Sequence, residues 1–304
     1  MTKAEPSPPL DYAALKSGGI IMQKDDDFFS IRLNFPGGRV PAEKLSKIQE
    51  VADEYGRGEI RLTARQGIEI PWIEFGKIES ARRELSEAGL SLGACGPRFR
   101  AVTACPGSQV CKLGLVNSQG FSARIDKEFG GRLLPHKFKV SVSGCPNGCS
   151  KPSENELGFM GIAEPELDSQ ACNGCSLCTD ICKESALSMH DGKPRRSSER
   201  CVLCGDCIQS CPTEAWKTKR TGYAVFVGGK MGRHPALGEK IADFVSDDTG
   251  IKIIEKCLDF YKREGCRRER LYDLIHRVGL DRFKAQILLG RSLCFNGKYE
   301  ERCP

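Results

Sequence analysis

The chain has 304 residues, of which 39% are hydrophobic and 28% are charged. These proportions are typical of a folded globular protein and exclude a disordered chain, a collagen and a long coiled coil. The net charge of +6 is small, so charge alone indicates no nucleic-acid partner, although it suits an anionic ligand. No apolar run approaches the roughly 18 residues of a membrane span, and the opening residues carry no secretion signal. We therefore expect a cytoplasmic protein with no membrane span and no nucleic acid among its partners.

Cysteine is unusually abundant, with 17 residues in the chain. A secreted protein with so many cysteines would carry a signal peptide and form disulfides, whereas thiols in a reducing compartment point to bound metal. The spacing of the cysteines then indicates which metal.

Four strand-like segments follow a proline-containing N-terminal arm (residues 1–18, with Pro6, Pro8 and Pro9), which we expect to be mobile or to wrap onto a partner. In each segment polar and apolar side chains alternate, so the polar ones share a face. The polar faces are Ser30, Arg32 and Asn34; Arg61, Thr63 and Arg65; Arg98 and Arg100; and Lys137, Lys139, Ser141 and Ser143. The opposing apolar residues are Phe29, Ile31, Leu33 and Phe35; Ile60, Leu62 and Ala64; Phe99 and Ala101; and Phe138, Val140 and Val142.

The four polar faces carry several arginines and lysines but no acid. A single such face is typical of the solvated side of a sheet. Across four segments that interpretation weakens, because solvent-facing surfaces usually mix acidic with basic residues. A cationic cavity that binds a strongly anionic ligand is the favoured interpretation.

Four cysteines between these segments form a C-x5-C pair and a C-x3-C pair. They are Cys105 and Cys111 in TACPGSQVC, and Cys145 and Cys149 in SGCPNGCS. Four thiolates without ferredoxin spacing suggest a 4Fe-4S cluster of their own. The pattern alone would also fit a set of buried thiols, and the cationic segments around it favour the cluster.

Residues 166–218 contain the run C-x2-C-x2-C-x3-C twice, which makes an internal repeat similar to bacterial two-cluster ferredoxins. In such runs three thiolates hold one cluster and the fourth reaches the other. We therefore assign one 4Fe-4S cluster to Cys172, Cys175, Cys178 and Cys211, and a second to Cys201, Cys204, Cys207 and Cys182. Zinc is the alternative, but zinc sites usually use two separated C-x2-C pairs. We therefore interpret this segment as an electron-transfer module that passes electrons one at a time.

Residues 235–290 show helical periodicity and no motif that suggests chemistry. The basic run KREGCRRERL is typical of a solvated surface, with contact to an acidic electron donor as the alternative. We expect Cys95 to be a small buried side chain. No role is assigned to Cys257 or Cys266, and Cys294 and Cys303 could be free thiols.

The chain resembles the sulfite/nitrite reductase family. The segments that carry the resemblance are FFSIRLNFPGG, IRLTARQ, LPHKFKV and YAVFVGGKMGRHP, together with the C-x5-C and C-x3-C pairs, and they occur in the family's order. The inserted ferredoxin motif is similar to the dissimilatory-type branch, and the compact chain is most similar to anaerobic sulfite reductase catalytic subunits. The resemblance implies sirohaem as a cofactor, and with the ferredoxin-type sites it implies three 4Fe-4S clusters.

The resemblance also implies roles for individual residues. Cys105, Cys111, Cys145 and Cys149 would hold a cluster, and Cys149 would also be the proximal ligand of the sirohaem iron. The substrate anion would be bound by Arg32, Arg100, Lys137 and Lys139. The sirohaem macrocycle and its carboxylates would be held by Arg61, Thr63, Arg65, Gln66, Arg98, Gly228, Gly229, Lys230 and Arg233.

These features predict an α+β fold with four parts. They are the N-terminal arm (1–18), a ferredoxin-like half-domain of sulfite reductase (19–90), a sirohaem/4Fe-4S α/β domain (91–165 and 219–304) and an inserted two-cluster ferredoxin domain (166–218). Many relatives carry two tandem copies of this module, which pack about a pseudo-two-fold axis, and this chain carries one. We therefore expect a homodimer or larger oligomer, in which an anion-binding residue serves its own sirohaem or its neighbour's.

The implied activity is the six-electron reduction of sulfite to sulfide under anaerobic conditions. No nicotinamide or flavin motif is evident, so the electrons would come from another protein or subunit. Nitrite reduction to ammonia is the alternative, but nitrite-selective relatives tend to replace the second lysine of KFK, and Lys139 is retained. An electron-transfer or sirohaem-carrying protein without turnover is the alternative of another class, and such a carrier would need no anion pocket.

Overall fold

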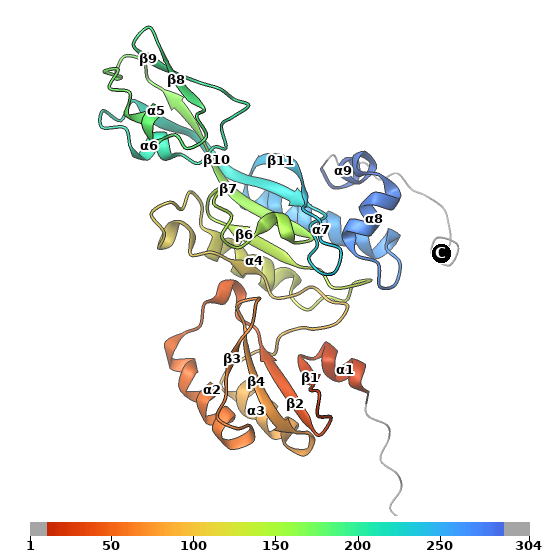
Figure 1. Ribbon diagram of the computed structural model, residues 1–304. Helices are drawn as coiled ribbons and strands as arrows, with labels where there is room; N and C mark the ends of the chain where they lie inside the picture. Colours follow the sequence, from red (N-terminus) through yellow and green to blue (C-terminus); the bar gives the residue numbers. More distant parts are fainter. Residues whose placement is uncertain (1–10, 289–304) are drawn as a thin grey trace, which may run out of the picture.

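The computed structural model describes residues 11–288, which form three regions arranged one after another along the molecule (Figure 1). A four-stranded sheet with its helices lies at one end, a five-stranded sheet lies in the middle, and a small cysteine-rich region lies at the other end. Pro6, Pro8, Pro9, Cys294 and Cys303 lie outside the described residues. Within residues 11–288, no helix combines the length and the apolar character that crossing a membrane requires.

The first region is an antiparallel sheet in the order β1-β2-β4-β3, preceded by a short helix at the end of the predicted arm. Its elements are α1 (Tyr12–Ser17), β1 (Ile20–Met22), β2 (Phe28–Leu33), η1 (Pro36–Gly38), α2 (Ala42–Tyr55), β3 (Arg61–Leu62), β4 (Ile68–Glu74), η2 (Phe75–Lys77) and α3 (Ile78–Glu87). The alternation predicted for β2 is confirmed, because Phe29, Ile31 and Leu33 are buried with the apolar faces of α2 and α3. Each such burial contributes about 1.5–3 kcal/mol to folding.

The segment around β3 is oriented differently from the prediction. The alternation predicts that Ile60 and Leu62 are buried, but Leu62 is 84% exposed and Ile60 is 40% exposed. The strand is only two residues long and lies at the edge of the sheet. It ends at a turn in which the Thr63 N–H donates to the Gly67 carbonyl, and Gln66 has a φ of 60°. The alternation of polar and apolar residues does not show whether such a short edge strand is covered by other side chains.

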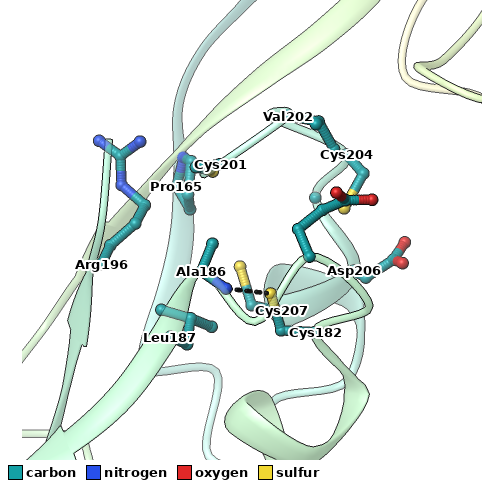
Figure 2. Close-up of a pocket in the computed structure, with 12 residues that line it drawn as sticks. Pro165, Cys182, Ala186, Leu187, Arg196, Cys201, Val202, Cys204, Asp206 and Cys207 are labelled. Atoms are coloured by element: carbon teal, nitrogen blue, oxygen red, sulfur yellow. Dashed lines mark hydrogen bonds between the residues drawn. The ribbon is translucent and has the colours of Figure 1, made fainter. Parts of the chain in front are cut away.

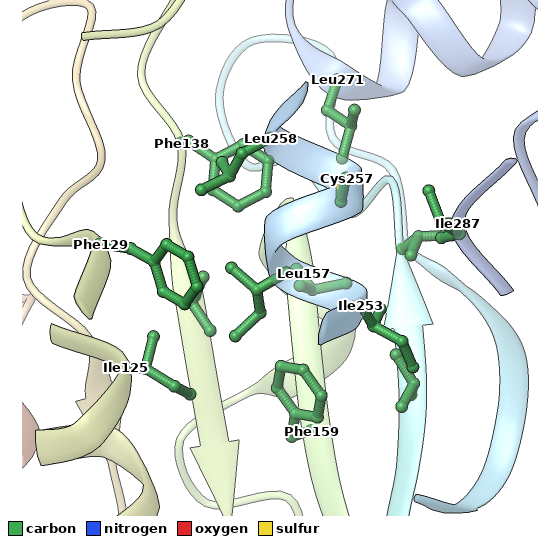
Figure 3. Packing of buried hydrophobic residues seen from close by; sticks show 14 of the residues in the cluster. Ile125, Phe129, Phe138, Leu157, Phe159, Ile253, Cys257, Leu258, Leu271 and Ile287 are labelled. Atoms are coloured by element: carbon green, nitrogen blue, oxygen red, sulfur yellow. The ribbon is translucent and has the colours of Figure 1, made fainter. Parts of the chain in front are cut away.

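The second region is a mixed sheet in the order β11-β10-β7-β6-β5, in which β5, β6 and β7 run parallel. Its elements are β5 (Thr103–Ala104), η3 (Gly107–Gln109), α4 (Ser118–Phe129), β6 (Val140–Ser143), η4 (Pro152–Glu154), β7 (Leu157–Leu167), β10 (Trp216–Val227), β11 (Glu239–Val245), α7 (Asp247–Glu264), α8 (Leu271–Val278) and α9 (Leu280–Leu288). Figure 3 shows part of its core, in which Phe138 and Phe159 of the sheet region gather with Ile253 and Leu258 of α7. The core thus packs α4 and α7 together against the sheet, and a Cβ on Gly250 of α7 would lie 2.7 Å from the Phe121 ring of α4.

The helical prediction for residues 235–290 is confirmed for α7, α8 and α9 but is wrong for β11. Tyr223 of β10 pairs with Val245 of β11, and Val227 pairs with Glu239, so the segment becomes the edge strand of the sheet. Tertiary pairing with β10 therefore decides the structure of β11.

The cysteine-rich region is inserted between two strands that pair along their length. β7 and β10 are antiparallel neighbours from Leu157↔Val227 to Leu167↔Trp216, and the insertion begins where this ladder ends. It contains α5 (Leu177–Ile181), β8 (Leu187–His190), β9 (Lys193–Arg196) and α6 (Asp206–Gln209). The long β7–β10 ribbon therefore carries the insertion away from the central sheet, as Figure 1 shows.

Candidate functional site

Two parallel strands bring the first cysteines to one edge of the central sheet. β5 pairs with β6, with Thr103 opposite Ser141. Cys105 directly follows β5 and Cys145 lies two residues after β6, so both leave the sheet at the carboxyl ends of adjacent strands. The Gly144 N–H donates a hydrogen bond to Cys105 Sγ at 3.0 Å. This contact joins the loop of the C-x5-C pair to the loop of the C-x3-C pair.

Serine side chains hold the loop that carries Cys145 and Cys149. Ser143 Oγ and Ser150 Oγ lie 2.6 Å apart, and the Ser150 N–H donates to Ser143 Oγ at 3.2 Å. Ser150 Oγ also donates to the Val142 carbonyl at 2.8 Å. These bonds explain why the polar face predicted for the end of β6 is buried, because its hydroxyl groups form hydrogen bonds with the loop that carries Cys145 and Cys149.

The four cysteines of the two pairs lie near one another. Burial raises the pKa of the Cys145 thiol, and the backbone N–H of Asn147 opposes that shift. The charges of three neighbouring thiols raise the pKa further, and these thiols belong to Cys105, Cys149 and Cys111. Four soft sulfur donors that influence one another are the donor set that a 4Fe-4S cluster requires.

The ferredoxin-type cysteines line two hollows. One is lined by Cys182, Cys201, Cys204 and Cys207, with apolar residues and three charged ones beside them (Figure 2). The other is lined by Cys172, Cys175, Cys178 and Cys211. Each hollow combines three cysteines of one run with the last cysteine of the other, the exchange that the spacing predicts. Within residues 11–288, no three His, Cys, Asp or Glu side chains form the close group that would hold a single metal ion.

The Arg65 side chain crosses from the first region to the second. Its Nη1 donates to Asn155 Oδ1 at 3.1 Å, and its Nη2 donates to the carbonyls of Ala101 and Val140 at 2.5 and 3.2 Å. Burial lowers the pKa of Arg65 to about 10, and the charge of Glu156 opposes this. Among the described residues its buried Nε has no hydrogen-bond partner, so one donor of this buried cation is open to a ligand.

Arg32 and Arg100 approach each other at Cys95. Arg32 Nη1 lies 3.5 Å from Cys95 Sγ, and Arg100 Nη1 donates to the Ala94 carbonyl at 3.2 Å. Burial lowers the pKa of Arg100, and the charge of the nearby Cys95 thiol opposes this shift. Cys95 is 2% exposed, as expected of a small buried side chain, but its sulfur contacts a guanidinium group.

Lys137 and Lys139 lie just before β6. Burial lowers the pKa of Lys139 to about 8; the charge of Glu156 opposes this, and the charges of Arg65 and Arg270 lower it further. Burial also lowers the pKa of Lys137, and so does Arg270. Lys139 is therefore charged at neutral pH but loses its proton at only slightly higher pH.

Two buried carboxylates that the sequence analysis does not single out face these cations. Glu69 on β4 is 7% exposed and accepts a hydrogen bond from Arg32 Nε at 2.6 Å. Glu156, just before β7, is fully buried and forms an ion pair with Arg270. The four polar segments themselves carry no acid, but β4 and the residue that precedes β7 supply one each. In the sequence, the burial of Glu69 is indicated only by its position between two isoleucines that lie in the core.

The turn between β3 and β4 fixes two residues of the predicted sirohaem set near Cys105. Gln66 forms two hydrogen bonds with the backbone of Ala104, from Nε2 to the carbonyl and from the amide to Oε1, both at 2.8 Å. Thr63 Oγ1 accepts from the Gly67 N–H at 3.0 Å. Gln66 thus ties the first region to the residue that precedes Cys105.

The other residues of the predicted sirohaem set are spread more widely. Arg61 lies 3.5 Å from Glu59, and Arg98 donates to the Gly131 carbonyl at 2.9 Å. Lys230 is paired with Asp273 of α8 at 2.7 Å. Gly228 and Gly229 follow β10, where a Cβ on Gly229 would lie 2.2 Å from the Ser153 carbonyl, and Arg233 is exposed. The close backbone approach explains why a glycine stands at 229.

The residues present fit the groups that the resemblance implies. The Nε atoms of Arg65 and Arg100 are buried donors without partners among residues 11–288, and they could bind carboxylates or a substrate anion. Leu62, at the end of β3, is 84% exposed, and Val110, beside Cys111 on the loop of the C-x5-C pair, is 81% exposed. Large exposed apolar side chains, together with unpartnered cationic donors, suit an amphipathic macrocycle.

Comparison with known proteins identifies the family. Residues 95–292 match the profile of the nitrite and sulphite reductase 4Fe-4S domain, and residues 21–88 match that of the nitrite/sulfite reductase ferredoxin-like half domain. The chain belongs to the nitrite and sulphite reductase family. The α+β fold predicted from the sequence is confirmed by this membership and by similarity to solved structures.

Several relatives cover most of the chain. It is 37% identical over 287 residues to the coenzyme F420-dependent sulfite reductase of Methanocaldococcus jannaschii, a match that covers 93% of this chain and 46% of that protein. It is 29% identical to an anaerobic sulfite reductase subunit of Salmonella typhimurium, over 86% of this chain and 84% of that subunit. The crystal structure of dissimilatory sulfite reductase I has a TM-score of 0.74 at 21% identity, over 94% of this chain and 79% of that chain. This chain thus spans about half the length of the methanogen relative.

Proposed function

We propose that this family member is a sirohaem-dependent sulfite reductase that reduces sulfite to sulfide. The observation that carries the proposal is the set of cations Arg32, Arg100, Lys137 and Lys139, gathered with buried counter-charges beside the strands that lead to the cysteine loops. Relatives named as sulfite reductases that match most of the chain support the same substrate. Sulfite carries negative charge at neutral pH, so a desolvated cationic pocket suits it.

The four cations divide into two roles. Arg32 and Arg100 keep their charge at every physiological pH and hold the anion, because a guanidinium does not readily lose a proton. Lys139, with a pKa of about 8, supplies protons to the oxygen atoms that leave the sulfur, and Lys137 stands two residues away to assist. Sirohaem, when bound, would supply the iron centre for binding and electron transfer to the substrate.

Electron supply is the task proposed for the other cysteines. Cys105, Cys111, Cys145 and Cys149 would hold one 4Fe-4S cluster, with Cys149 also bound to the sirohaem iron. The two hollows of the inserted region would hold two further clusters, which receive single electrons from a separate protein or subunit. The proposal includes a homodimer, because many relatives carry two copies of this module that pack together and this chain carries one. It also places the protein in the cytoplasm of cells that live without oxygen.

Nitrite reduction to ammonia is the second candidate. The ferredoxin–nitrite reductase of Zea mays is 30% identical to this chain, but over only 49% of it. Sulfite reductases match a larger share of the chain, and Lys139 of the KFK segment is present. A carrier without turnover is disfavoured because it would gain nothing from the desolvated cations around Arg100.

Two measurements test the proposal on protein purified without oxygen. Three clusters and one sirohaem predict about 13 iron atoms per chain, and the visible spectrum should contain haem-type bands. With a reduced viologen as electron donor, sulfite should give sulfide faster than nitrite gives ammonia at equal low concentration. Absence of the haem bands would overturn the enzyme, and faster nitrite turnover would overturn the substrate.

A further inference from the structure

A buried ion pair lies beneath the two lysines of the proposed anion pocket. The side chain of Glu156 is 0% exposed, and Arg270, whose side chain is 11% exposed, donates a hydrogen bond from Nε to Glu156 Oε1 and forms an ion pair with the same oxygen through Nη2. The other carboxylate oxygen of Glu156 accepts a hydrogen bond from the backbone N–H of Lys139 at 3.0 Å. One carboxylate therefore connects Arg270 to the backbone of Lys139.

Arg270 belongs to the basic run that the sequence analysis interprets as a solvated surface, and for this residue that interpretation is wrong. The turn between α7 and α8 docks on the segment before the lysines, where the Arg268 N–H donates to the Pro135 carbonyl at 3.1 Å. Arg270 directly precedes α8, and its side chain points inward, while Arg267 is exposed. The C-terminal helices thus contribute one cation to a pocket otherwise built from earlier segments.

The charged groups that act on Lys139 come from four parts of the chain. Glu156 favours its protonated form, whereas Arg65, Arg270 and Lys137 disfavour it. Among these, only Arg270 lies in the C-terminal helical segment, and only Glu156 is acidic. A buried pair of this kind is costly to break, because either partner left alone is an uncompensated buried charge.

We propose that Arg270, anchored by Glu156, is a positioning residue for proton delivery by Lys139. The pair fixes the backbone of Lys139 and holds a second positive charge near its ammonium group, so that Lys139 releases a proton readily to an oxygen leaving the substrate. In that step an N–H bond of Lys139 breaks and an O–H bond forms, and the neutral amine regains a proton from water. This inference rests on the proposed sulfite reduction.

The test measures the protonation of Lys139 in the holoenzyme in two ways. Trace acetylation with acetic anhydride, followed by mass spectrometry across a pH series, reports the fraction of neutral amine without any turnover. The pH dependence of sulfite reduction with a viologen donor reports the same group during catalysis. In the unmodified protein both should have a midpoint near pH 8, because Lys139 has a pKa of about 8.

The variants move this midpoint in opposite directions. Arg270→Met removes a positive neighbour, so the midpoint should rise by about 0.5–1 pH unit. Glu156→Gln removes the negative neighbour and should lower it by a similar amount. Arg270→Lys keeps the charge and should restore most of the original midpoint. Arg267→Met, an exposed change in the same basic run, is the matched control and should leave the midpoint unchanged.

The outcomes separate this inference from the proposed function. Equal midpoints in the unmodified protein, Arg270→Met and Glu156→Gln would overturn the role of the pair. If Arg270→Met does not fold, Glu156→Gln decides alone, because a purely structural role predicts no downward shift. If the unmodified protein does not reduce sulfite, the proposed function fails, while the acetylation midpoints still decide whether Arg270 acts on Lys139.

Discussion

The carboxylate of Glu69 lies 2.6 Å from Nε of Arg32, so one of the proposed substrate-binding arginines carries its own buried counter-charge. Side-chain hydrogen bonding to Glu69 raises the pKa of Arg32 against the lowering effect of burial. Glu69 also lies 4.0 Å from Arg61. A single acid of the first region thus orients Arg32 while it reduces the positive charge that the pocket offers to an anion.

Replacing Glu69 by glutamine should tighten sulfite binding. The amide oxygen of the new side chain would still accept the hydrogen bond from Arg32 Nε, but the negative charge beside the pocket would be gone, so KM for sulfite should fall by about 3- to 10-fold. Glu69→Ala, which removes the hydrogen bond as well, should raise KM because Arg32 is no longer held. Steady-state kinetics on both variants checks this, with the exposed change Glu59→Gln as control. Similar increases in KM for both Glu69 variants would contradict the expectation.

Lys139→Arg should separate anion binding from proton delivery. Arginine keeps the positive charge but does not readily donate a proton, so kcat should fall by about 10²-fold with little change in KM. The unmodified enzyme should lose activity as the pH rises through about 8, since Lys139 then becomes neutral. In the variant this decline near pH 8 should be absent. Lys151→Arg, at a lysine that is 68% exposed, is the control, and an equal loss of kcat there would show that the effect is not specific to the pocket.

The cysteine sites could be predicted from the sequence because ligand spacing is a local property. Each ferredoxin-type run folds around a short helix, and the hollow that contains Cys182 with the second run follows from the known exchange of the fourth cysteine. Burial is not local. The alternation around Leu62 predicts a buried side chain, but within residues 11–288 nothing covers it and Leu62 is exposed.

The acid beneath the lysines could not be predicted for a related reason. Glu156 and Arg270 are 114 residues apart, and no spacing rule connects them. Arg270 stands in a run of basic residues whose neighbour Arg267 is exposed, so composition predicts a solvated surface. Only the docking of the α7–α8 turn near Pro135 brings the two charges together.

The exchange of cysteines between the two ferredoxin-type runs can be tested by counting iron in double variants. Cys175→Ala should remove one cluster, or about four iron atoms per chain. Adding Cys211→Ala should remove no more, because both residues line the same hollow. Adding Cys182→Ala instead should remove about four further atoms, because Cys182 lines the other hollow. The reverse pattern would show that each run holds its own cluster.

Gly161 on β7 controls the position of the loop that begins at Gly144. A Cβ at position 161 would lie 2.4 Å from the Gly144 carbonyl and 2.5 Å from Val116 Cγ2, closer than packed atoms approach. Gly144 also donates to Cys105 Sγ, so a shift of this backbone moves the ligands of the proposed cluster. Gly161→Ala should therefore lower the free energy of unfolding by about 1–3 kcal/mol and, with it, reduce iron and haem-band content.

Gly76→Ala is the matched control for this prediction, because no atom lies within 4 Å of the added Cβ. Urea unfolding measures the stability of both variants, and iron analysis with the visible spectrum measures cofactor content. If Gly161→Ala loses the haem bands but keeps iron at the ferredoxin-type sites, the substitution disturbs the contact between the Cys105 loop and the Cys145 loop. A variant that is destabilised but keeps its full iron and haem bands would show that Gly161 serves packing alone and does not position the cysteine loop.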